Sequence, residues 1–252
     1  MGRTSTRVFA ALFSAAMVVA AAGCGSSSKT STAPNTPEQL KADKAIAQQA
    51  VLTLSDMPPG FKATPHQASS DDTPEPVLRR FAQCAKVPQA EIADFIKRND
   101  PKQPDVDSAD FSRLDVAKGA LTTFENNVAI DRSSKHIGSQ FDVLAAKSTL
   151  KCWKDFFRAA MVSSSDTGVS ARGVTVVSLP IDKIADQSAA FGVRATVVRP
   201  DRSTVKLYFD FYIARSGRAA ISLLATGVGE QVDSSLAQSL MQTVADRLEK
   251  TT

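Results

Sequence analysis

The last third of the chain alternates apolar and polar side chains, the pattern typical of β-strands with one buried face. The clearest case is the run VKLYFDFYI, residues 205–213, in which every second side chain is Val, Leu, Phe or Ile. After the last strand, Asp233 or Ser234 is a helix cap, and an apolar stripe from Leu236 to Leu248 predicts a final helix. The strands predicted in this region are 174–179, 189–198, 205–213 and 219–226.

The first half of the folded region reads mainly as helices separated by prolines. Thr36, Pro37 and Gln39 form a helix start, because Thr caps a helix, proline suits its first position and the Gln side chain can bond back to the cap. We expect this helix to end near residue 50, ahead of the Pro-Pro-Gly run at 58–60, which no helix can include. The further elements expected, in chain order, are a helix opened by Pro74 and Pro76, a short helix around 92–96, a loop at 100–108, strands at 111–116 and 121–131, a long helix from Ser133 or Ser134 with a break near Ser148, and a loop at 163–173.

This uneven mixture of helices and antiparallel strands predicts an α+β fold, with an antiparallel sheet packed against helices. Residues 37–252 contain no Pro/Gly-rich linker and no internal repeat. We therefore expect them to form a single domain.

The first 23 residues read as a signal peptide. Arg3 and Arg7 give a basic start, and residues 8–22 are apolar apart from one serine, a run shorter than the roughly 20 residues of a membrane-spanning helix. The sequence Ala-Ala-Gly-Cys that ends at Cys24 resembles the bacterial lipobox, whose cysteine receives a diacylglyceryl group and becomes the mature N-terminus. The alternative is an ordinary signal peptide with a chance cysteine at its cleavage site.

A lipidated Cys24 makes the membrane the first expected partner, reached through acyl chains on the extracytoplasmic face of the cell membrane. Residues 24–36 are then the modified cysteine and a flexible tether, because the run GSSSKTSTAPNT has no large apolar side chain. A tether this short holds the domain close to the bilayer.

Composition fits an exported globular domain. Of 252 residues, 43% are hydrophobic and 22% charged, which excludes a disordered chain. The formal charge of +4 falls to +2 once Arg3 and Arg7 are removed with the signal peptide. Such a balanced chain gives no support to nucleic acid as a partner, since that needs clustered positive charge.

Two cysteines remain in the mature domain, Cys84 and Cys152. An even number of cysteines in an exported domain suggests a disulfide, and two cysteines allow one pairing. A reactive thiol or a metal ligand is the alternative, but the chain has no CxxC motif and neither cysteine has a histidine nearby in the sequence. The bridge would tie the helix that carries Phe81 to the long helix that follows Ser133.

Several stretches resemble a broad group of actinobacterial cell-envelope lipoproteins that includes the PknH-like extracellular sensor domains. The matching pieces are LTLSDMPPGF at 52–61, the strand-to-helix run 127–152, and the closing hairpin and helix. The resemblance implies an antiparallel sheet backed by helices, with a groove for an envelope ligand. It supplies no catalytic residue.

The chain offers little that is typical of catalysis. His66 and His136 are the two histidines, and we interpret both as solvated surface residues. The pattern SxxK occurs at Ser26, Ser148 and Ser203 without the partner motifs of serine enzymes, and no GxSxG, HExxH or P-loop is present. The acidic pairs Asp71-Asp72 and Asp105-Val106-Asp107 lack the ligand spacing of a calcium loop and read as solvated charge. No catalytic residue, metal or cofactor is predicted.

Tyr208, Asp210 and Tyr212 share one face of the predicted strand 205–213. If a helix covers that face, the tyrosines are packing residues with hydrogen-bonded hydroxyls. If the face is open, the three residues line a groove suited to a sugar or an amphipathic ligand. They are the candidate ligand-binding residues of the sequence.

The leading hypothesis is a membrane-anchored extracytoplasmic lipoprotein, not an enzyme, whose domain binds an envelope component or a partner protein. A carrier of lipid or glycolipid in the cell envelope is the first alternative, and it would need a large apolar cavity. A cell-wall hydrolase is the second, with Ser148, His66 and His136 as its nameable residues.

Overall fold

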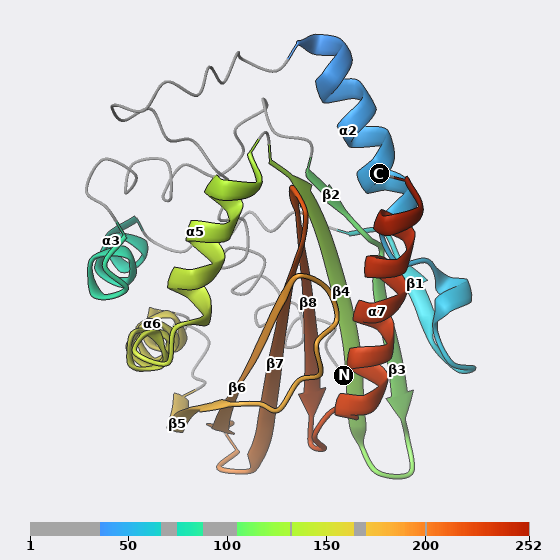
Figure 1. Ribbon diagram of the computed structural model, residues 1–252. Helices are drawn as coiled ribbons and strands as arrows, with labels where there is room; N and C mark the ends of the chain where they lie inside the picture. The colour runs from blue at the N-terminus through green and yellow to red at the C-terminus, as the bar shows by residue number, and fades with distance from the viewer. Residues whose placement is uncertain are drawn as a thin grey trace.

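The computed structural model describes residues 36–66, 75–87, 105–131, 133–163, 170–199 and 201–251, in which eight strands form one antiparallel sheet (Figure 1). The order across the sheet is β1-β3-β4-β8-β7-β6-β5, and β2 pairs with the later part of β4. The α+β architecture expected from the sequence is confirmed. The strands are β1 (Lys62–Thr64), β2 (Asp105–Asp107), β3 (Asp110–Asp115), β4 (Ala120–Ile130), β5 (Ser170–Ser178), β6 (Gln187–Val198), β7 (Thr204–Ser216) and β8 (Ala219–Val228).

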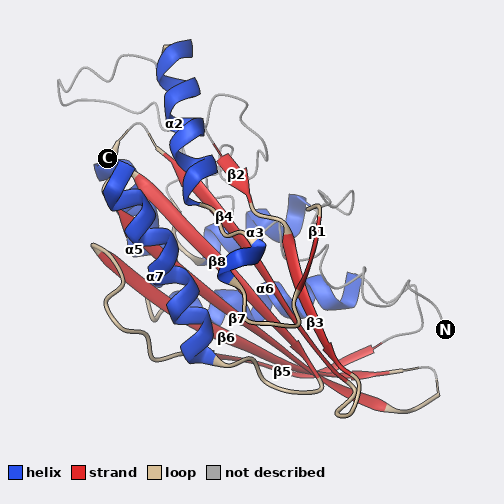
Figure 2. Ribbon diagram, turned by 90° about the vertical axis from the view of Figure 1, so that its right-hand side faces the viewer, coloured by secondary structure: helices blue, strands red, loops and turns tan. Residues whose placement is uncertain are grey.

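Helices cover both faces of this sheet (Figures 1 and 2). On one face, α2 and α7 pack against β4, β7 and β8, and their apolar side chains form a first core with Phe111, Phe124 and Tyr212. On the other face, α3, α5 and α6 pack around β5 to β8, and a second core contains Trp153 and Phe209. The helices are α2 (Pro37–Ala50), α3 (Glu75–Cys84), α5 (Ser134–Ala145), α6 (Thr149–Ser163) and α7 (Ser234–Thr251), with a short 3₁₀ turn η1 at Leu54–Asp56.

The helix ends expected from capping residues are confirmed. Thr36 Oγ1 accepts a hydrogen bond from Gln39 N at 3.2 Å, and Gln39 Oε1 accepts one from Thr36 N at 2.9 Å. Asp233 caps α7 by accepting from the backbone of Ser235, and Ser133 caps α5. The break expected near Ser148 separates α5 from α6. Each cap supplies a partner to backbone N–H groups that have none inside the helix.

The predicted disulfide is present. Cys84, at the end of α3, is bonded to Cys152 in α6, with the two Cα atoms 5.6 Å apart. Next to the bridge, the ring of Trp153 lies between Phe81 and Phe191, at centroid distances of 4.2 and 4.8 Å. The covalent link and the rings together hold α3 and α6 against the second face of the sheet.

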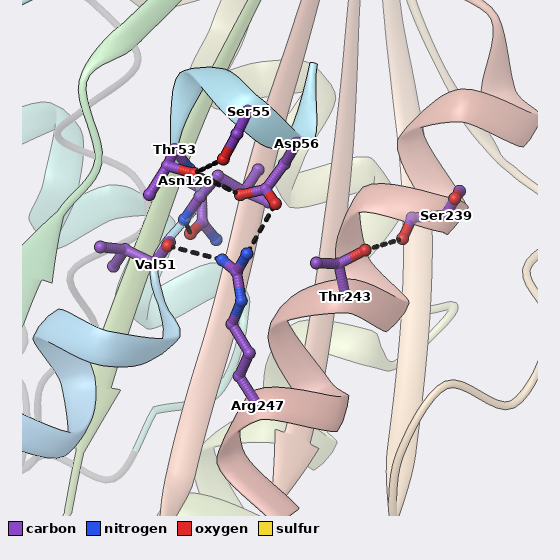
Figure 3. A network of polar contacts seen from close by, with 9 residues as sticks. Val51, Thr53, Ser55, Asp56, Asn126, Ser239, Thr243 and Arg247 are labelled. Atoms are coloured by element: carbon purple, nitrogen blue, oxygen red, sulfur yellow. Dashed lines mark hydrogen bonds and ion pairs between the residues drawn. The ribbon is translucent and has the colours of Figure 1, made fainter. Parts of the chain in front are cut away.

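A polar network fastens the segment after α2 to the rest of the domain (Figure 3). Arg247 of α7 donates to the carbonyl of Val51 at 3.0 Å and to the Asp56 carboxylate at 2.6 Å. The buried Asn126 of β4 accepts from Leu52 N at 3.1 Å, and its amide donates to the Ser222 carbonyl at 2.8 Å. Two of these contacts supply partners to backbone groups at the start of this segment, the Val51 carbonyl and Leu52 N.

Two expectations about loops are wrong, and one strand was not expected. The expected loop 100–108 contains β2, β5 begins at Ser170 inside the expected loop 163–173, and β1 follows the Pro-Pro-Gly run, where no strand was predicted. All three are edge positions, where pairing with a neighbouring strand makes a strand without an alternating apolar pattern. The expected signal peptide, Cys24, most of the tether, the short helix at 92–96 and the Asp71-Asp72 pair lie outside the described residues.

Candidate functional site

The face of β7 that carries Tyr208, Asp210 and Tyr212 is covered. Asp210 and Tyr212 have no exposed surface, and Tyr208 is partly buried. The cover consists of α7 and the segment 179–186 between β5 and β6, which contributes Ile184 to the same core as Tyr212. The interpretation of these residues as the lining of an open groove is therefore wrong for Asp210 and Tyr212.

The buried carboxylate of Asp210 is neutralised from the neighbouring strand. Arg194 of β6 is paired in register with Tyr208, and its guanidinium lies over the Tyr208 ring and forms an ion pair with Asp210. Gly192 makes room for this pair, because a Cβ there would lie 2.7 Å from an Arg194 nitrogen and 2.8 Å from Asp210 Oδ1. Burial raises the pKa of Asp210, and the bond from Arg194 opposes that shift.

Two polar atoms on this face have no hydrogen-bond partner among the described residues, Asp210 Oδ2 and the Tyr212 hydroxyl. The expectation of a hydrogen-bonded hydroxyl is thus wrong for Tyr212, whose pKa is raised mainly by burial and further by the Asp210 charge. Because these groups are sealed beneath a helix and a loop, this region is a packed polar core rather than a binding surface.

A second polar cluster lies on the opposite face, at the β3–β4 end of the sheet. Phe111 and Phe124 are paired across these strands, and both rings are buried in the first core. Side chains alternate along a strand, so the neighbouring residues Asp110 and Glu125 lie on the other face. His66, two residues after the end of β1, completes the cluster, and the imidazole Nδ1 is 2.7 Å from Asp110 Oδ1.

One candidate ligand atom from each of His66, Asp110 and Glu125 lies within 4.8 Å of the other two. All three side chains are partly buried. Imidazole nitrogen and carboxylate oxygen are donors that divalent metal ions accept, and neutral imidazole or carboxylate can also transfer protons. Among the described residues, this is the group that could hold a metal ion.

The electrostatics of this cluster follow from its excess of carboxylates. The hydrogen bond to Asp110 raises the pKa of His66 to about 9, despite partial burial. Burial, together with the negative charge of Asp110, raises the pKa of Glu125 to about 7. Burial and the charge of Asp107 likewise raise the pKa of Asp105 to about 6. The cluster therefore holds more negative charge than its surroundings stabilise.

These contacts correct two interpretations from the sequence. His66 is not a solvated residue, because its side chain is 18% exposed and paired with Asp110. Asp105 and Asp107 are not simply solvated charges either, because the amide of Asn127 donates to both carboxylates.

His136 is likewise partly buried, and its Nδ1 is 3.0 Å from the Asp131 carboxylate. The interpretation of this histidine as a solvated surface residue is also wrong. Ser148, the serine considered for a hydrolase, is exposed in the turn between α5 and α6.

The sequence interpretation missed Asp110 and Glu125 altogether. The available signal was Glu125, a carboxylate in the middle of the otherwise uncharged strand LTTFENNVAI. A lone charge in a central strand needs a partner, and the pairings of β1 with β3 and of β3 with β4 supply it.

The chain matches no known family model, no curated protein and no solved structure. Within the described ranges, none of the helices combines the length and the hydropathy needed to cross a membrane.

Proposed function

We propose that this protein is a lipoprotein, anchored through acyl chains on Cys24 to the extracytoplasmic face of the cell membrane, whose folded domain binds a component of the envelope or a partner protein. The observation that carries the proposal is the cysteine that directly follows an apolar run and the small residues before it. One acyl chain holds a protein only marginally, whereas a diacylglyceryl group supplies two. The proposed anchor is therefore stable without a peptide span.

The disulfide supports an exported location. Cys84 and Cys152 are bonded and lie in helices that form one wall of the second core. Disulfides of this kind persist in oxidising compartments and are rare in the cytosol of mesophiles. Export and the bridge are thus consistent with each other.

Binding is favoured over catalysis by what the two histidines contact. The imidazoles of His66 and His136 each have a carboxylate partner, and no hydroxyl group is hydrogen-bonded to either imidazole among the described residues. Ser148 is exposed on a turn, and no described histidine is hydrogen-bonded to it. The hydrolase hypothesis loses its nameable nucleophile on this ground.

The experiment that tests the proposal compares the wild-type chain with Cys24→Ser in its native host. We expect the wild type to incorporate radiolabelled palmitate and to partition into detergent, and Cys24→Ser to lose both properties. The matched control is the double variant Cys84→Ser/Cys152→Ser, which removes the disulfide but keeps Cys24 and should still be labelled. Palmitate labelling of Cys24→Ser equal to that of the wild type would overturn the anchor.

The binding part of the proposal needs its own measurement. The anchored chain is cross-linked in cells, and its neighbours are identified by mass spectrometry. One partner should recur in repeated experiments on wild-type cells and be missing from Cys24→Ser cells. Stoichiometric lipid extracted from the purified domain would instead support the carrier alternative, because a carrier retains its cargo.

A further inference from the structure

The cluster of His66, Asp110 and Glu125 differs from an ordinary acidic patch in how it is assembled. Its members come from the segment after β1, from β3 and from β4, and the pairings between these strands bring them together. Their donor atoms lie within 4.8 Å of one another. Ligand atoms around a bound zinc ion are separated by roughly 3.0–3.4 Å, since each metal–ligand bond is about 2.0–2.1 Å. Side-chain rotations that move these donor atoms by about an ångström would bring all three within bonding distance of one ion.

The negative charges in this region outnumber the positive charge of His66. Among the described groups that act on the Glu125 carboxylate, His66 supplies the positive charge, while Asp107 and Asp110 both add negative charge. No described residue forms a hydrogen bond to the Glu125 carboxylate, although this side chain is partly buried. A partly buried carboxylate without a donor is costly unless it is protonated or a cation is bound.

The nearby amide does not relieve this imbalance. Asn127 donates to Asp105 and to Asp107, so its two N–H groups are already used on the neighbouring strand β2. The carboxylates of Asp105, Asp107, Asp110 and Glu125 thus surround one imidazole. A divalent ion would neutralise them more fully than the imidazolium does.

We propose that His66, Asp110 and Glu125 form a binding site for a divalent first-row transition-metal ion, with zinc as the best probe. An imidazole with two carboxylates suits zinc, manganese or iron, whereas calcium and magnesium select oxygen ligands alone. Three protein ligands leave a coordination position for water or for a group on a bound partner. The inference does not depend on the anchor at Cys24.

The molecule contains its own comparison for this site. His136 and Asp131 form a similar pair, at 3.0 Å and with side-chain exposures of 19% and 2%. There, however, Asp131 also accepts a hydrogen bond from Ser133 N, and no third ligand converges on the pair among the described residues. A histidine–aspartate pair alone is thus a structural contact, and Glu125 is what distinguishes the proposed site.

The test is a competitive zinc titration of the full chain, purified in detergent and stripped of metal, against a chromophoric chelator. It is repeated in Cys24→Ser so that no free thiol competes. The wild type should bind zinc with one-to-one stoichiometry. Glu125→Gln and His66→Gln should each weaken binding at least about tenfold, because each removes a ligand, whereas His136→Gln should leave affinity unchanged.

Cobalt gives an independent readout on the unmutated chain, because Co²⁺ in a low-symmetry nitrogen and oxygen site absorbs visible light. Bands that appear with cobalt and disappear on adding zinc support the site even if a variant fails to fold. Absence of stoichiometric zinc binding, equal affinity in Glu125→Gln, or tighter binding of calcium than of zinc would each overturn the proposal. If the wild-type chain took up no palmitate, the proposed anchor would fail, but the outcome of the zinc and cobalt titrations would not change.

Discussion

Replacing Arg194 with methionine should leave the Asp210 carboxylate buried without a counter-ion. Asp210 has no exposed surface, its Oδ1 is paired with the guanidinium, and its Oδ2 has no partner among the described residues. Removing one member of a buried ion pair costs about 3–5 kcal/mol, because the remaining charge is neither solvated nor neutralised. Arg194→Met should therefore lower the free energy of unfolding by about that amount. Most of the cost should be recovered in Arg194→Met/Asp210→Asn, which removes the charge and keeps the side-chain shape.

The assay is urea denaturation at pH 7, followed by circular dichroism and with the disulfide intact. The control pair is Lys118 and Glu230, also an ion pair but with side chains 58% and 56% exposed. Lys118→Met should leave the denaturation midpoint unchanged, since exposed pairs contribute little. If Arg194→Met were as stable as Lys118→Met, or if the double variant were no more stable than Arg194→Met, the reasoning from burial would be refuted.

Three further predictions concern the bridge, the polar network and the effect of pH. The double variant Cys84→Ser/Cys152→Ser should lose about 4 kcal/mol of stability in a thermal or urea melt, because the bridge closes a loop between cysteines 68 residues apart; an unchanged melt would contradict this. Asn126→Ala should cost about 1–3 kcal/mol for each buried backbone group that it leaves unpaired, and a loss well below that range in the same melt would mean that water replaces the amide. In the presence of chelator, the metal-free chain should become less stable as the pH rises from about 5 to about 9. The reason is that folding raises the pKa of Glu125 to about 7 and that of His66 to about 9, and so favours their protonated forms. Glu125→Gln should flatten the lower half of this profile, and a rise in stability with pH would contradict the assignment.

Much of the fold could be predicted because its signals are local. Thr36, Ser133 and Asp233 mark helix starts through their own hydrogen bonds, and the long strands alternate along their length. The cysteine pairing followed from counting alone. Each of these depends on residues whose partners are near in sequence or are unique in the chain.

The short strands could not be predicted, for the opposite reason. β1 has three exposed residues, and β2 contributes Val106 alone to the core, so neither has a pattern that distinguishes it from a loop. Both exist because β3 and β4 offer free edges for backbone pairing. The candidate metal cluster depends on that same pairing, so the sequence shows only the lone charge of Glu125 and not the residues that join it.

The sequence left open whether the candidate ligand residues on β7 pack in a core or line a groove, because alternation identifies two faces without saying what covers the second. Asp210 and Tyr212 are polar, and a polar face normally meets water. Here Arg194 neutralises the carboxylate, and the segment 179–186 crosses over the strand and is tied to α7 by a hydrogen bond from Asp182 N to Gln238. Asp210 and Tyr212 are buried by the loop 179–186, and the path of a loop cannot be read from the alternation of side chains.

The most direct test of the account is the mass of the N-terminal peptide of the protein extracted from membranes of its native host. After proteolysis, the account predicts a peptide that begins at Cys24 and carries a thioether-linked diacylglyceryl group. A peptide that begins elsewhere, or one that begins at Cys24 with an unmodified thiol, would contradict it.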